Sequence, residues 1–195
     1  MVANKLFDRN NVRRSSQAHP GLRLRRRPDS HEPLCRLHVL PISLKDSYQI
    51  PGIDATTGLT ALISHPSTSY SSLPALLLSL GAVLYVKTNV PQTMMTADSH
   101  NHVIGRTVNP HNTSLTAGGG SGGEGALIAL KGSVIGFGTD LAGSIRIPAM
   151  CDGVYGFKPS VGSFQLRGSK SRLWRGARAC GLSLCRAVGE YGENL

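Results

Sequence analysis

Apolar residues in this chain form two runs, each divided by a glycine. The first run covers residues 73–86 (LPALLLSLGAVLYV) and divides at Gly81. Before the division, Ser71 or Ser72 can cap a helix, Pro74 suits its first turn and Gly81 can end it. After it, AVLYV is a short continuous apolar stretch, which is typical of a buried parallel strand.

The second run repeats this order of helix and strand. ALIAL (residues 126–130) has a composition suited to a helix, and SVIGFG (residues 133–138) again predicts a buried strand. Alternation of this kind implies an α/β fold, with a sheet covered by helices on both faces. Neither run has the roughly 20 apolar residues of a transmembrane helix, so we expect no transmembrane segment.

A glycine-rich stretch, AGGGSGG (residues 117–123), leads into the second run. Glycine has no Cβ, so it suits places where backbone must come very close to a reacting group. Such a composition is most often a flexible linker. Here it is followed at once by apolar elements and then by a second glycine-flanked serine, Ser144. The order therefore predicts a structured site.

Two common motifs overlap this stretch, and neither fits its surroundings. Residues 119–123 match G-x-S-x-G, the nucleophile elbow of α/β-hydrolases, but that fold needs a histidine downstream and the last one is His111. Residues 118–123 match G-x-G-x-x-G, but the dinucleotide motif must follow a strand, and NPHNTSLTA is polar. No Walker loop occurs, because Lys131 precedes its glycine.

The net charge of +10 lies mainly at the two ends of the chain. Residues 1–34 have a net charge of +5 and residues 163–195 of +4, whereas residues 35–162 have only +1. With few aromatic residues to stack on bases, this distribution does not favour a nucleic-acid partner. The arginine-rich start is typical of a disordered arm, and its acidic residues disfavour a mitochondrial presequence.

Cysteine and histidine give no sign of a metal or cofactor. The four cysteines form no CxxC pair and no zinc spacing with histidine; they are Cys35, Cys151, Cys180 and Cys185. Free thiols are typical of a reducing compartment, so we expect a cytoplasmic protein.

Several segments together resemble one family. They are LHVLPISLKDS around Lys45, LLLSLGAVLYVKTNVPQTMMT around Thr88, NPHNTSLTAGGGSGGEGAL, and the D-x-x-G-S motif ending at Ser144. In this order they are similar to the amidase signature family, over roughly residues 37–162. NPHNTSLTAGG and GGEGAL look most like fungal general amidases and fatty acid amide hydrolases.

The resemblance implies a partial amidase signature fold, a mixed β-sheet with helices on both faces and its C-terminal half missing. We expect three regions: a basic, disordered arm at residues 1–34, the partial domain at residues 35–162, and an irregular basic tail at residues 163–195.

The resemblance also implies a Ser–cis-Ser–Lys triad, in which Lys45 is the base and Ser144 is the nucleophile. The bridging serine, in a cis peptide, falls on Gly120, so its hydroxyl is missing. We expect Lys45 Nζ, the Gly120 backbone and Ser144 Oγ to converge in one pocket. Ser121 follows Gly120 and should point differently.

The oxyanion hole of the family is made of backbone N–H groups, which fall on Leu141, Ala142, Gly143 and Ser144. We expect those of residues 141–143 to be free. The family usually has glycine where this chain has Ala142. We interpret Asp140 and Arg146 as structural residues that hold this loop.

The implied activity is hydrolysis of small carboxylic amides to an acid and an amine or ammonia, through an acyl-enzyme and without metal or cofactor. Because Gly120 lacks the hydroxyl, we expect this activity to be impaired. The alternative is a catalytically inactive, amidase-like fragment or pseudoenzyme. The oligomeric state stays open.

Overall fold

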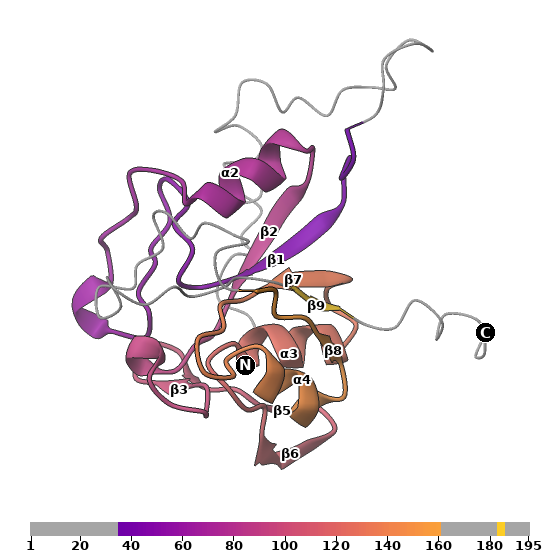
Figure 1. Cartoon of the computed structure of the whole chain (residues 1–195). Helices are drawn as coiled ribbons and strands as arrows, with labels where there is room; N and C mark the ends of the chain where they lie inside the picture. Colours follow the sequence, from indigo (N-terminus) through magenta and orange to yellow (C-terminus); the bar gives the residue numbers. More distant parts are fainter. Residues whose placement is uncertain (1–34, 161–182, 186–195) are drawn as a thin grey trace.

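The computed structural model describes residues 35–160 and 183–185, which form a five-stranded sheet with helices on both faces (Figure 1). The strand order is β2-β1-β7-β9-β8, with β1 parallel to β2 and β7, and β9 antiparallel to β7 and β8. The strands are β1 (Pro41–Lys45), β2 (Val83–Thr88), β7 (Ile135–Phe137), β8 (Tyr155–Gly156) and β9 (Ser183–Cys185).

The central strand β1 presents different chemistry to its two faces. Successive side chains of a strand point to opposite faces of the sheet. Ile42 and Leu44 are buried in an apolar cluster with Leu73 and Leu77 of α2 (Ser72–Ser79). Ser43, between them, bonds to α3 (Gly122–Ala129) on the other face. Lys45 therefore lies on the α3 side.

A second layer covers α3. Helix α4 (Arg146–Asp152) packs on α3 through a small apolar cluster of Ile128, Ile145 and Ala149. The smaller elements lie outside these layers; they are η1 (Thr60–Leu62), η2 (Gln92–Met94), β3 (His100–Asn101), β4 (Gly105–Arg106), β5 (Val108–Asn109) and β6 (Asn112–Thr116). β3 pairs with β4, and β5 with β6.

The elements predicted from the apolar runs are present. Helix α2 has Pro74 in its first turn and is followed by Gly81 at φ +89°. β2 and β7 are parallel to β1, as expected of buried strands. The predicted α/β fold is confirmed, and so are the helices on both faces.

The expected basic flanks lie largely outside the described residues. Residues 1–34 and most of 163–195 fall there. Three residues of the expected irregular tail, Ser183–Cys185, form β9 and pair with β7 and β8. The sequence pattern did not predict this strand. Within the described part of the chain, no helix has the length and apolar character needed to cross a membrane.

The carboxyl group of Asp152 lacks a compensating partner among the described residues. Asp152 lies at the end of α4 and is fully buried, and neither carboxyl oxygen has a hydrogen-bond partner in the part of the chain that the structure describes. It packs closely on α3, where a Cβ on Gly125 would lie 2.3 Å from Oδ2. Burial raises the pKa of Asp152 from 3.8 to about 7. The folded state therefore binds this proton more tightly than the unfolded state does.

We predict that Asp152→Asn stabilises the protein at alkaline pH. The cost of the buried charge is absent below about pH 4, grows as the pH rises, and is complete above about pH 7. At pH 8 the variant should gain about 2–4 kcal/mol in the free energy of unfolding. Urea unfolding at pH 5 and pH 8 measures this difference. An equal effect at both pH values would contradict the assignment.

Candidate active site

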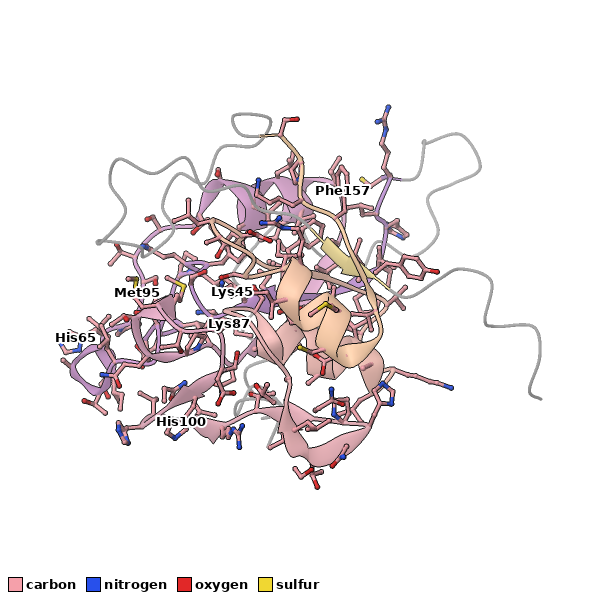
Figure 2. The ribbon with its side chains drawn as sticks, turned by 60° about the horizontal axis from the view of Figure 1, so that its bottom comes forward. Lys45, His65, Lys87, Met95, His100 and Phe157 are labelled. Carbon is pink, nitrogen blue, oxygen red and sulfur yellow. The ribbon has the colours of Figure 1, made fainter. Side chains whose placement is uncertain are left out.

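Lys45 is a buried amine at the end of β1. Its side chain is 1% exposed, and Nζ donates hydrogen bonds to Thr139 Oγ1 at 2.8 Å and to Thr139 O at 3.2 Å. Figure 2 shows it in the interior, near Lys87 on the neighbouring strand. Burial lowers the pKa of Lys45 from 10.5 to about 7, although the negative charges of Asp140 and Glu124 oppose this. A large share of Lys45 is therefore neutral near pH 7.

Gly120 lies between Lys45 and Ser144. A Cβ built on Gly120 would be 2.5 Å from Ser144 Oγ and 3.4 Å from Lys45 Nζ. The three positions come from residues far apart in sequence, and the structure brings them together as expected. A side chain at position 120 would thus contact both the Ser144 hydroxyl and the Lys45 amine, and this chain has no hydroxyl there.

Two features next to Gly120 can be compared with the implied triad. The peptide bond geometry differs from it, whereas the direction of Ser121 is as expected. The described residues contain no cis peptide bond, so Gly120 lacks the implied cis geometry; a cis bond before a residue other than proline costs about 2.5–4 kcal/mol. Ser121 does point differently. Its N–H donates to Ser144 O at 3.0 Å, and its hydroxyl donates to Thr139 O at 3.5 Å.

Asp140 organises the loop that contains Ser144. This fully buried carboxylate accepts hydrogen bonds from the N–H groups of Gly143, Ile145 and Arg146. The guanidinium of Arg146 adds two more, at 3.0 and 3.1 Å. Burial alone would raise the pKa of Asp140, but the bonds from Arg146 and the three N–H groups lower it to about 2. These hydrogen bonds hold the loop, which is the structural role expected of Asp140 and Arg146.

The expected set of free N–H groups needs one correction. Gly143 donates its N–H to Asp140 Oδ1 at 2.7 Å, so this group is not free. The reason is local: the carboxylate, three residues earlier, folds the loop onto itself. Within the described part of the chain, the N–H groups of Leu141, Ala142 and Ser144 have no such acceptor. Leu141 and Ala142 are exposed, and Ser144 is half-buried.

Two residues beside Lys45, one half-buried and one fully buried, escaped the sequence analysis. Thr139 is its hydrogen-bond partner. Glu124 in α3 is fully buried and accepts hydrogen bonds from Ser43 and Thr88, each at 2.6 Å. Burial raises the pKa of Glu124 to about 7, against the effects of these bonds and of Lys45. The one sequence signal for Glu124 was a lone carboxylate at the start of an apolar helix.

A second buried lysine is already paired. Lys87 Nζ lies 3.3 Å from Asp46 Oδ1 and donates to Asp54 O at 2.7 Å. Asp46 also accepts from the N–H of Thr57. Among the described residues, no cluster of three or more histidine, cysteine or acidic side chains could hold a metal ion. Around Gly120, the site thus brings the hydroxyl of Ser144 close to the buried amine of Lys45.

Comparisons with known proteins agree on one family. The chain matches the amidase family over residues 20–179, a wider span than the motifs alone cover. It is 47% identical to an acetamidase of Aspergillus oryzae over 142 residues, which are 73% of this chain and 26% of the relative. It is 48% identical over 130 residues to an acetamidase of Emericella nidulans, covering 67% of this chain and 24% of the relative.

Solved structures show the same likeness. A fatty acid amide hydrolase superimposes with a TM-score of 0.77 at 36% identity, covering 81% of this chain and 28% of that one. A bacterial aryl acylamidase does so with a TM-score of 0.78 at 31% identity, covering 91% and 36%. The chain thus spans about a quarter of the length of the curated relatives it matches. On the combined weight of motifs, fold and comparisons, it belongs to the amidase signature family.

Proposed function

We propose that this chain contains the reactive centre of a hydrolase for carboxylic amides, with Ser144 as nucleophile and Lys45 as base, and that Gly120 impairs it. The observation that supports this most is the place of Gly120, where one Cβ would come within 3.4 Å of Lys45 Nζ and 2.5 Å of Ser144 Oγ. A serine hydroxyl there would be placed to pass a proton between them.

The reaction follows from these positions. A serine hydroxyl is a weak nucleophile until a base takes its proton. Neutral Lys45 would accept that proton as Ser144 Oγ attacks the amide carbon, and would return it to the departing nitrogen. The acyl-enzyme would then be hydrolysed by water. Backbone N–H groups of residues 141, 142 and 144 would stabilise the developing oxyanion.

The proton path is the weak step. In the described structure, Lys45 Nζ donates to Thr139, and no hydrogen bond joins it to Ser144. General acid–base catalysis contributes about 10²–10⁴-fold to enzyme rates. We therefore expect low activity from the chain as written.

The substrate class and the location can be proposed as well. The similarity of the chain to acetamidases favours small amides as substrates. The free thiols of Cys35 and Cys151 fit a cytoplasmic location.

The second candidate is a catalytically inactive, amidase-like protein. Two observations favour it: position 120 has no hydroxyl, and the N–H of Gly143 is engaged by Asp140.

We predict that Gly120→Ser raises the rate of acetamide hydrolysis by about 10²-fold or more, because it restores a hydroxyl between base and nucleophile. Ser144 Oγ must turn aside to admit the new side chain, which is a small adjustment for a short, rotatable group. The matched control is Gly120→Ala, which adds the Cβ without the hydroxyl and should show no gain. A folded Gly120→Ser protein with no gain over Gly120→Ala would favour the inactive protein.

We further predict that a fluorophosphonate labels Ser144 of the Gly120→Ser protein in a pH-dependent way. Since the pKa of Lys45 is lowered to about 7, the labelling rate should rise as the pH increases through about 7 and level off above it. Lys45→Met should abolish this rise. Labelling that increases only near pH 10 would show that Lys45 is not the base.

A further inference from the structure

The proposed reaction gives no role to Glu124, although this residue lies beside Lys45. Its carboxylate lies over the sheet at the centre of three strands. Ser43 Oγ of β1 donates to Oε2 and Thr88 Oγ1 of β2 donates to Oε1, both at 2.6 Å. On β7, a Cβ on Gly136 would lie 1.9 Å from Oε2, so only glycine leaves room for the carboxylate.

The two hydroxyl groups that bind Glu124 flank Lys45. Ser43 lies two residues before Lys45 on β1, so both side chains point to the same face. Thr88 is the register partner of Lys45 on β2. The carboxylate is thus fixed over the strand positions next to the amine, in a layer from which water is excluded.

From this arrangement we propose that Glu124 is a positioning residue, which sets the charge of the Lys45 amine through a carboxylate that Ser43 and Thr88 hold over the neighbouring strand positions. The proposal rests on Lys45 as the base of the proposed function. Its physical basis is that charges interact strongly in a low-dielectric interior. The negative charge of Glu124 favours protonated Lys45, and Lys45 in turn favours ionised Glu124.

Other charged groups near this layer are balanced by partners of their own. Asp140 also favours protonated Lys45, but it is paired with Arg146. Asp46 is paired with Lys87. Two tyrosines next to Glu124, Tyr48 and Tyr85, have raised pKa values and stay neutral near pH 7. Asp152 also has a pKa raised to about 7, but it is not among the charges that act on Lys45. Of the two carboxylates that do act on Lys45, Glu124 is therefore the one whose own charge changes in the same pH range.

The consequence is that Lys45 and Glu124 titrate as a coupled pair. When two ionisable groups interact strongly, their protons leave in steps that belong to the pair. The state needed for catalysis has a neutral amine, and protonation of Glu124 favours that state. Ionised Glu124 thus raises the affinity of the Lys45 amine for a proton, and protonated Glu124 allows the amine to be neutral.

The test is a direct titration of Lys45 in the full chain, by NMR of side chains labelled with ¹⁵N-lysine and assigned with Lys45→Met. Glu124→Gln keeps the shape of the side chain and removes its charge. The pKa of Lys45 should fall by about one unit or more in this variant. Asp152→Asn, which removes another buried carboxyl group, should leave the pKa of Lys45 unchanged.

A second variant covers the case in which Glu124→Gln does not fold. Ser43→Ala keeps the carboxylate and removes one of its hydrogen bonds, so Glu124 protonates more readily and the pKa of Lys45 should again fall. An unchanged pKa of Lys45 in whichever of these variants retains the native amide spectrum would overturn the proposal. Because the titration needs no substrate, the result stands even if the chain hydrolyses no amide.

Discussion

The site depends on the burial of a polar layer between β1 and α3. Lys45 and Glu124 are both withdrawn from water there, and desolvation disfavours the charged form of each. This one constraint gives the amine a share of neutral form near pH 7. It also explains why hydroxyl groups from β1 and β2 line the layer, since a buried carboxylate needs donors. The apolar cluster on the opposite face, with α2, holds the sheet in place.

A second, smaller constraint shapes the loop that contains Ser144. The carboxylate of Asp140 gathers three N–H groups and one guanidinium, so the chain turns tightly just before α4. Ser144 is at this turn and points toward Gly120. The same carboxylate occupies the N–H of Gly143. The carboxylate that fixes the place of Ser144 therefore also uses one of the backbone N–H groups of this loop.

Much of this arrangement was predictable from the sequence. The apolar runs predicted α2, β2 and β7, because their period and their glycine boundaries are local signals. The motif resemblance implied that Lys45, Gly120 and Ser144 lie near one another, and they do so in the structure; their roles stay predictions. The bond from Gly143 to Asp140 and the strand β9 could not be foreseen. Both depend on how the chain folds back on itself, and neither leaves a periodic pattern. Glu124 gave a weak signal, since its partners Ser43 and Thr88 lie 81 and 36 residues away.

The close approach of Gly136 to Glu124 also limits how this protein can evolve. Any side chain at position 136 would collide with the carboxylate, and the backbone of β7 has little freedom to retreat because β7 is paired on both sides, with β1 and β9. Position 136 is therefore open to substitution only after position 124 has become shorter. The two positions form an ordered pair: the acid must be lost before the glycine can be. Among descendants of such a chain, Gly136 should be retained longer than Glu124. A larger residue at position 136 would indicate that Glu124 had been replaced earlier.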